Sequence, residues 1–480
     1  MLTAHRVADV RRAEEALAAT LPDGELMRRA ARGLAEALDH VKAGEVVLML
    51  VGPGNNGGDA LFAAVHLLDR GVRVDLCLLD STKVHADGLA AATSAGAKIV
   101  DAPSHHRHCL DAMFGIGARP GLTGRAAEWS EWIAGARPHT VAVDVPSGVD
   151  VDGATLPAVH VMADATVTFG TFKNALLVSP AAGAAGWNGT AIAELVDIGL
   201  GPHLPAPSIE AIEASDGHLL VETFDWLRDP SSHKYSRGVV GIAAGSAEYA
   251  GAAHLCVAGA LTGMAGMVRF VGDDELSRRV VDRAPEVVAG HGRVQAWVVG
   301  PGSGDDAEAR LAAAIDDGAS LVVDASALQF LPDSFDVPAL LTPHAGELAM
   351  MLGTRRDAVE AEPLASVAEA AERWGTTVLL KGARTLVATP GRVTRVNLSG
   401  SPWLGTAGSG DVLAGLAGSL LASGADPHDA GSLAAFLHGA ASIRANRGGP
   451  VTASAVAAAL PGTLAAFHDG LLDDVRDWRD

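Results

Sequence analysis

Short apolar runs, each closed by glycine or proline, alternate with segments of helical spacing along most of this 480-residue chain. The run Glu45–Val51 is an example, because it ends in Gly-Pro-Gly and helical spacing follows from about Asp59 to Leu68. Such alternation is typical of βαβ units, whose strands form a parallel sheet that binds ligands at the carboxyl ends of the strands. The first half is predicted to contain further strands at 72–79, 98–100, 109–113, 140–145, 165–169 and 190–196.

The alternation stops at 201–207, Gly-Pro-His-Leu-Pro-Ala-Pro, and then restarts. Three prolines in this stretch predict a linker. We therefore expect two α/β domains, residues 1–208 and 209–480, which agrees with an average of roughly 150 residues per domain. The second half is predicted to contain strands at 239–244, 296–299, 320–323, 340–341, 377–380 and 385–388, and long Ala/Gly-rich helices at 251–267, 411–423 and 428–445.

Composition indicates an acidic globular protein. Hydrophobic residues make up 49% of the chain and charged residues 19%, as in folded domains. The formal net charge of −21 argues against nucleic acid and membrane surfaces as partners. The three cysteines lie far apart, which excludes a disulfide framework, and no apolar leader or bilayer-spanning run is found. We expect a soluble, cytoplasmic protein.

Residues 51–60, Val-Gly-Pro-Gly-Asn-Asn-Gly-Gly-Asp-Ala, combine a glycine turn with polar side chains. Glycines before a helix can bring backbone N–H groups to a phosphate, although the same pattern also occurs in simple tight turns. Side chains that bear oxygen follow other predicted strands, and in a parallel sheet Asn56, Asp111 and Ser147 converge at one edge. Such ligands suit an alkali or alkaline-earth cation, and the alternative is that they cap turns and helices.

Three motifs of the first half, at 52–59, 111–117 (Asp-Ala-Met-Phe-Gly-Ile-Gly) and 144–150 (Asp-Val-Pro-Ser-Gly-Val-Asp), together resemble the NAD(P)HX epimerase family. NADHX and NADPHX are hydrates of NADH and NADPH. The resemblance implies a Rossmann-like three-layer fold, a potassium ion on Asn56, Asp111 and Ser147, and an acid/base role for Asp144. The loop around Lys173 departs from the family, with Thr-Phe-Lys-Asn in place of Ala-Pro-Lys-Pro. The residues that the resemblance places on the substrate are Asn55, Asn56, Gly57, Gly58, Asp59, Gly115, Ile116, Gly117, Ala118, Arg119, Pro120, Gly121 and Asp144.

In the second half, residues 403–415 place three glycines before a predicted helix that begins at Asp411. Backbone amides at such a turn can receive anionic oxygens, and the aspartate can take a proton from a hydroxyl group. The alternative is that Asp411 is only a helix cap. No GKS or GKT occurs, so the turn is not a Walker-type phosphate loop. The segment Lys381–Thr385 follows a predicted strand and is either a phosphate clamp or a hairpin turn.

Histidines form two patterns that superficially suggest a metal site. His344 is followed by Glu347, but a metal-binding His-x-x-Glu lacks its second histidine here. His105, His106 and His108 lie beside Cys109, but crowded loop histidines without further ligands usually bind no metal, and we expect none there.

These segments, with Gly-Pro-Gly at 300–302 and Thr-Pro-His-Ala-Gly-Glu at 342–347, resemble the ribokinase-like superfamily and, within it, the ADP/ATP-dependent NAD(P)HX dehydratases. The resemblance implies a ribokinase-like α/β fold with Asp411 as the catalytic base. This chain departs from the family at Ala407, where glycine is usual. The implied substrate contacts are Ala252, Gly302, His344 and Asp411. The implied nucleotide contacts are Lys381, Gly382, Ala383, Arg384, Thr385 and Gly410.

Together the two resemblances predict a bifunctional enzyme that repairs hydrated nicotinamide nucleotides. The first half would epimerise R- and S-NADHX or NADPHX, and the second would dehydrate the S form with ADP or ATP, in the presence of Mg²⁺ and K⁺. Two alternatives remain open. The second half could be a small-molecule kinase of the hydroxymethylpyrimidine type, or the whole chain could be a non-catalytic nucleotide-binding regulator. We expect small-molecule partners and a homo-oligomer, since α/β enzymes of this kind commonly associate.

Overall fold

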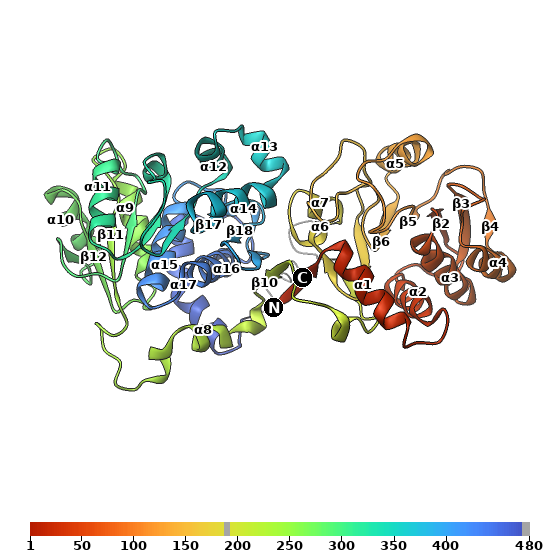
Figure 1. Cartoon of the computed structure of the whole chain (residues 1–480), viewed down its shortest axis with the longest axis horizontal. Coiled ribbons are helices and arrows are strands. Elements are labelled where there is room, and N and C mark those ends of the chain that lie inside the picture. The colour runs from red at the N-terminus through yellow and green to blue at the C-terminus, as the bar shows by residue number, and fades with distance from the viewer. Residues whose placement is uncertain (187–192, 473–480) are drawn as a thin grey trace. The chain divides into compact units, whose positions relative to one another are not determined.

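The computed structural model describes residues 1–186 and 193–472 (Figure 1). The chain forms two compact units, one made of Thr3–Ile209 and the other of Glu210–Asp480 with Met1–Leu2. Positions 190–192 of the strand predicted at 190–196 lie outside the described residues.

A parallel sheet of seven strands forms the centre of the N-terminal unit. The elements of this unit are β1 (Leu2–His5), α1 (Val7–Ala18), α2 (Glu25–Ala37), β2 (Val46–Val51), α3 (Asn55–Asp69), β3 (Arg73–Leu78), α4 (Ala86–Ala95), β4 (Lys98–Ile99), β5 (His108–Ala112), α5 (Gly124–Ala136), β6 (His139–Val143), β7 (Ala165–Phe169), β8 (Phe172–Lys173), α6 (Asn174–Leu177), α7 (Ala181–Ala184), β9 (Glu194–Val196) and the 3₁₀ helix η1 (Gly201–His203). The strand order is β4-β3-β2-β5-β6-β7-β9, and every pair is parallel. Taking β2 as the first strand, this is the 3-2-1-4-5-6 order of Rossmann-like folds with β9 added, so the predicted fold is confirmed.

Both faces of this sheet are covered, because alternate residues of β2 enter two different cores. Val47, Met49 and Val51 pack with side chains of α1, α2 and α3. Leu48 and Leu50 instead pack with side chains of α5. Successive side chains of a strand point to opposite faces, so a continuously apolar strand requires a layer on each side. The result is the three-layer arrangement predicted for this half.

The C-terminal unit also contains a largely parallel sheet. Its elements are β10 (Ile209–Ala211), η2 (Ala214–Asp216), α8 (His218–Thr223), η3 (Asp225–Arg228), β11 (Val239–Ala243), α9 (Ala250–Ala260), β12 (Met267–Phe270), α10 (Asp274–Arg283), β13 (Val288–Ala289), β14 (Ala296–Val299), α11 (Ala307–Asp316), β15 (Ser320–Val323), η4 (Ala325–Gln329), β16 (Ala339–Leu341), α12 (Ala345–Leu352), α13 (Arg356–Ala361), α14 (Pro363–Trp374), β17 (Thr377–Leu380), β18 (Leu386–Ala388), β19 (Thr394–Val396), η5 (Pro402–Leu404), α15 (Ser409–Ala422), α16 (Pro427–Asn446) and α17 (Ala453–His468). The strands β13-β12-β11-β14-β15-β16-β17 are parallel in this order, and β18 and β19 extend the sheet as antiparallel strands. The predicted α/β fold of this half is confirmed.

The helix α15 lies in the centre of this unit, where it holds Asp411 at its N-terminal end. Every residue from Val412 to Ala422 is buried. Small residues allow this, because an ideal Cβ at Gly415 would lie only 1.9 Å from the carbonyl oxygen of Cys256 in α9. The Ala/Gly-rich composition of these helices therefore reflects close helix packing, and it fixes the position of the turn that precedes Asp411.

The helix predicted at 251–267 is wrong in its second part. The helix α9 ends at Ala260, and the last residue of the predicted range already begins strand β12. Gly263, with φ of +86°, adopts the left-handed conformation, which interrupts a helix. A short apolar run does not by itself distinguish a buried strand from a buried helix, and this explains the error. Within residues 1–186 and 193–472, no helix is both long and apolar enough to cross a membrane.

Candidate active sites

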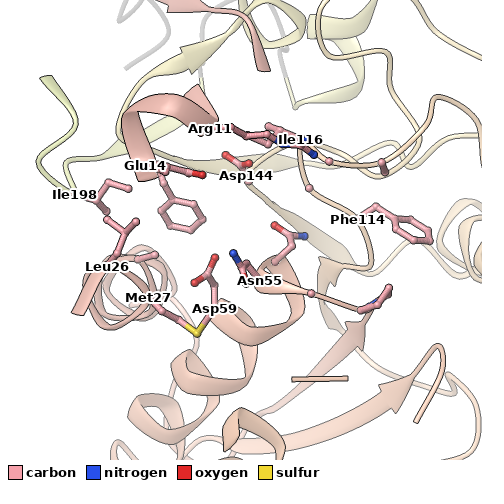
Figure 2. A pocket seen from close by; sticks show the side chains of 18 of the residues that line it. Arg11, Glu14, Leu26, Met27, Asn55, Asp59, Phe114, Ile116, Asp144 and Ile198 are labelled. Carbon is pink, nitrogen blue, oxygen red and sulfur yellow. The ribbon is translucent and has the colours of Figure 1, made fainter. Parts of the chain in front are cut away.

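A cavity of about 1100 Å³ opens at the carboxyl ends of the central strands of the N-terminal unit (Figure 2). Its wall includes the turn after β2 and the loop after β5, the point at which doubly wound sheets bind ligands. Pockets for drug-sized molecules have volumes of about 300–1,000 Å³, so this cavity is large enough for a bulky ligand. The predicted residues that line it are Asn55, Asn56, Asp59, Gly115, Ile116, Gly117, Ala118, Arg119, Gly121 and Asp144.

Three predicted substrate contacts, Gly57, Gly58 and Pro120, are not part of the cavity wall. An ideal Cβ at Gly57 would lie 2.3 Å from the carbonyl oxygen of Gly52, so this glycine lets α3 approach the end of β2. A Cβ at Gly58 would lie 2.9 Å from Cε of Met27 in α2. The helix α3 begins at Asn55 rather than near residue 59, so its first two turns carry Asn55, Asn56 and Asp59, which line the cavity.

Asp144 lies at the cavity in an ion pair with the buried Lys173. The Lys173 ammonium group also donates to Oγ1 of Thr168 at 2.9 Å and to the carbonyl oxygen of Phe169 at 3.0 Å. Lys173 and Thr168 both donate to Oδ1 of Asp144, and no described residue bonds to Oδ2, so this oxygen can contact a ligand. Asp144 also has φ of +69°, a strained conformation that is often found at functional sites. Although residues 171–174 depart from the family pattern, Lys173 still pairs with Asp144, the predicted acid/base.

Two further carboxyl groups, those of Glu14 and Asp59, face the same cavity (Figure 2). Burial and the nearby Asp144 charge raise the pKa of Glu14, and the same two causes together with Glu14 raise the pKa of Asp59 well above its usual value. Arg11, one turn before Glu14, also lines the cavity. Sequence reasoning missed the residues of α1 and α2, because no motif surrounds them and only tertiary packing brings these helices to the strand ends.

The residues predicted to hold potassium meet around the segment Met113–Gly115. Ser147 donates to Asp111 from its backbone N–H at 2.8 Å and from its hydroxyl at 2.6 Å. The backbone N–H of Phe114 donates to the Ser147 hydroxyl at 3.0 Å, and an ideal Cβ at Gly115 would lie 2.9 Å from Oδ1 of Asn56. Burial raises the pKa of the fully buried Asp111 carboxyl to about 6.

The donor chemistry of this group suits an alkali cation. Nδ2 of Asn56 is buried and has no hydrogen-bond partner among the described residues. A half-turn of the amide would present its oxygen at that position instead. With the Asp111 carboxylate and the Ser147 hydroxyl, the donors would then all be oxygen atoms, as alkali cations prefer.

In the C-terminal unit, charged residues from two strand ends meet the N-terminus of α15. Nζ of Lys381, after β17, lies 2.7 Å from Oδ1 of Asp324, after β15. An ideal Cβ at Gly410 would lie 3.6 Å from the same Nζ atom, so the first turn of α15 lies close to this pair. Burial and the Asp324 charge raise the pKa of Asp411 to about 6, against the opposing effect of Lys381. The arrangement combines backbone amides, a cation and a carboxylate that can accept a proton.

The other predicted residues of this unit lie at neighbouring strand ends. Residues 381–385 connect β17 to the antiparallel β18, so this segment is a hairpin connection, with Arg384 buried in it. His344 caps α12 through its ring and exchanges hydrogen bonds with Glu347. Gly302 packs on Ala252, since a Cβ there would lie 2.4 Å from the alanine methyl group. His344, Gly302 and Ala252 therefore have structural roles, and these roles are compatible with contacts to a ligand.

His438 of α16 was not predicted as part of this site. Burial lowers its pKa to about 4, the backbone of Ser409, the first residue of α15, acts in the opposite direction, and Nε2 of His438 has no hydrogen-bond partner among the described residues. A single histidine inside a long apolar helix carries no sequence signal of such a position.

Two family models match the chain. Residues 240–460 match the model described as NAD(P)H-hydrate dehydratase, and residues 23–175 match the model described as YjeF-related protein N-terminus. Among solved structures, an ADP/ATP-dependent NAD(P)H-hydrate dehydratase from Bacillus subtilis, co-crystallized with ATP/Mg²⁺, is 26% identical with a TM-score of 0.48 over 50% of this chain and 93% of its own.

Related proteins match this chain over most of their own length. The bifunctional NAD(P)H-hydrate repair enzyme of Mycobacterium leprae is 39% identical over 470 residues, which cover 93% of this chain and 95% of the relative. The enzyme of the same name from Mycobacterium tuberculosis is 41% identical over 445 residues, which cover 88% of this chain and 89% of the relative. With both halves matched in a single relative, the chain belongs to the family of bifunctional NAD(P)H-hydrate repair enzymes.

Proposed function

We propose that the two activities are divided between two domains. The N-terminal domain, residues 1–208, epimerises R- and S-NADHX or NADPHX, and the C-terminal domain, residues 209–480, dehydrates the S form with ADP or ATP. The observation that carries this proposal is the presence of two chemically different sites, an acidic cavity with paired Asp144 and a helix N-terminus with Asp411. We further propose that the enzyme acts in the cytoplasm as a homo-oligomer.

Dehydration requires a better leaving group than hydroxide. Asp411 accepts the proton of the substrate hydroxyl as that oxygen bonds to the terminal phosphorus of ADP, and the phosphorus–oxygen bond to AMP breaks. The C–O bond then breaks, phosphate leaves with the electron pair, and loss of a proton from the neighbouring ring carbon restores the double bond. Lys381 and the amides before α15 hold the phosphate charge, and Mg²⁺ accompanies the nucleotide phosphates. The contacts of Lys381, Gly382, Ala383, Arg384, Thr385 and Gly410 with the nucleotide, and those of Ala252, Gly302 and His344 with the substrate, are part of this proposal.

The products distinguish this reaction from the kinase alternative. Purified protein with S-NADHX, ADP and Mg²⁺ is expected to give NADH, AMP and phosphate in equal amounts. A stable phosphorylated nucleotide without release of phosphate would instead identify a kinase. Binding of both nucleotides without any product would favour the non-catalytic regulator.

Epimerisation requires that the hydroxyl-bearing ring carbon become planar and take up water again. Because this carbon is bonded to the ring nitrogen, loss of the protonated hydroxyl as water leaves a cation that the nitrogen stabilises. Glu14 or Asp59, whose pKa values are raised, supplies the proton, and the Asp144 carboxylate accepts one from the returning water. Residues 55–59 and 115–121 are proposed to surround the nucleotide, since most of them line the cavity.

The dehydratase rate should depend on pH through Asp411. A base must be ionised to act, so kcat/KM for S-NADHX is expected to rise with pH and to level off above about 6, where the pKa of Asp411 lies. Asp324→Asn removes a charge that raises this pKa and should shift the rising limb to lower pH. A rising limb that is unchanged in this variant would contradict the assignment of Asp411 as the base.

Potassium, if held by Asn56, Asp111 and Ser147, would neutralise the buried Asp111 carboxylate. Without a cation, the folded state holds a proton on Asp111 up to about pH 6, whereas the unfolded state loses it near the ordinary value of 3.8. The unfolding free energy should therefore fall by about 3 kcal/mol as the pH rises through this window. Bound K⁺ should reduce this loss of unfolding free energy, because it stabilises the ionised Asp111 carboxylate.

The measurement is the thermal midpoint of unfolding in potassium chloride and in choline chloride at equal ionic strength. The gain from K⁺ is expected to be larger at pH 7 than at pH 5, because the Asp111 carboxylate is ionised at the higher pH. An equal gain at both values, or no gain, would contradict a potassium ion at this site.

A further inference from the structure

We propose that His40, His108 and His139 form a binding site for a late first-row divalent cation such as Zn²⁺. One ring nitrogen of each histidine lies within 4.8 Å of the others. Three imidazoles with an open fourth position are a donor set that zinc accepts in proteins. Mg²⁺ and K⁺ prefer oxygen ligands, so this site differs in chemistry from the two cation sites proposed above.

The strands hold two of the three histidines side by side. His108 begins β5 and His139 begins β6, and the two residues are direct partners in the parallel ladder. Adjacent strands lie about 4.8 Å apart, and paired residues point to the same face of the sheet. The ring centroids are 6.3 Å apart. Both residues lie at the amino ends of their strands, whereas the cavity lies at the carboxyl ends, so the cation would not touch the substrate.

The third histidine is held by the turn that follows α2. The Arg70 guanidinium group donates to the carbonyl oxygens of Ala35 at 2.7 Å and of Leu38 at 3.2 Å, and it pairs with Asp39 at 3.0 Å. The His40 ring centroid lies 5.1 Å from that of His139 and 5.9 Å from that of His108. The third ligand is therefore placed by a turn whose backbone is already fixed.

A neighbouring carboxylate and a ring nitrogen without a partner among the described residues also favour a metal ligand role. Oε1 of Glu45 lies 3.6 Å from Nε2 of His108, and Nδ1 of His108 is buried without a hydrogen-bond partner among the described residues. A carboxylate beside a metal-bound imidazole orients the ring or completes the coordination.

Of the three histidines at 105, 106 and 108, only His108, the first residue of β5, belongs to the cluster. Nε2 of His106 lies 3.0 Å from the Asp75 carboxylate, and His105 is exposed. The histidine pattern beside Cys109 therefore contains one proposed ligand, His108, and the other two, His40 and His139, come from distant parts of the sequence.

The test is zinc binding to the full-length chain without a histidine tag, after treatment with a chelator. Calorimetry is expected to give one more Zn²⁺ per wild-type chain than per His40→Ala/His139→Ala chain. His139→Ala removes a ligand, so it should weaken zinc binding more than the loss of a residue that only contacts a ligand, which costs about 10–100-fold. Glu45→Gln changes such a residue and should weaken zinc binding by about 10-fold. Zn²⁺ should raise the thermal midpoint of wild type, since the cation joins the turn after α2 to two strands.

His105→Ala is the matched control, because this exposed histidine lies three residues before His108 but outside the cluster. It should bind Zn²⁺ as wild type does. Equal zinc stoichiometry and affinity in wild type and in His40→Ala/His139→Ala would overturn the proposal, as would an equal loss of binding in His105→Ala. His40 and His139 are exposed, so their replacement leaves the core intact. Loss of zinc binding in the double variant is therefore not explained by loss of folding.

Discussion

An Asp411→Asn variant is expected to lose the ADP-dependent dehydration of S-NADHX by about 100- to 10,000-fold and to keep the epimerisation of R-NADHX. The size of the loss is that of a missing general base. Asparagine keeps the shape of the side chain in the first turn of α15, and the helix behind it is buried from Val412 to Ala422, so folding should not change. Dehydration is followed by the near-ultraviolet absorbance of the reduced nicotinamide, and epimerisation by separating the R and S forms.

Asp333→Asn is a suitable control for this variant, because Asp333 is exposed in the same unit and should keep both activities. A variant at Asp411 that dehydrates S-NADHX at the wild-type rate would contradict the catalytic role of this residue, which lies in the first turn of α15 and does not cap the helix.

An Asp144→Asn variant is expected to show the opposite pattern, with epimerisation reduced about 100- to 10,000-fold and dehydration of S-NADHX unchanged. It should also unfold more easily, since Lys173 is 1% exposed and would lose its carboxylate partner. Breaking one side of a buried ion pair costs about 3–5 kcal/mol. The measurements are NADH recovery from R-NADHX and the midpoint of chemical unfolding.

The double variant Asp144→Asn/Lys173→Met separates catalysis from stability. Removal of both charges should restore most of the unfolding free energy, because replacing a whole buried pair is often neutral. Epimerisation should remain absent. If the double variant recovered epimerisation along with stability, Asp144 would be a structural residue. Asp101→Asn, an exposed position in the same unit, should behave as wild type.

Local sequence signals were sufficient to predict the strand ends that form the two sites. The turn after β2, the loop after β5 and the turn before α15 are marked by glycines beside polar residues, and such turns depend on nearby residues only. The predicted side chains Asn56, Asp111, Asp144 and Asp411 accordingly lie at carboxyl ends of strands or at helix starts. Topology then follows, because short crossovers and parallel strands leave few arrangements.

Long-range placement was not predictable in the same way. Glu14 reaches the cavity on α1, and His438 reaches Ser409 from α16, without any motif around either residue. Lys173 was noted in the sequence, but its pairing with Asp144 depends on how β8 is placed, and this strand pairs with β1 rather than with β7. The end of α9 was misplaced because apolar residues continue into β12, where only sheet pairing decides the conformation.

The central claim is that one chain carries both repair activities, and its most direct test uses a mixture of R- and S-NADHX with ADP and Mg²⁺. Wild-type protein is expected to convert the whole mixture to NADH faster than spontaneous epimerisation allows, as measured by near-ultraviolet absorbance. Recovery that stops at the S fraction, or no recovery with either ADP or ATP, would contradict the claim.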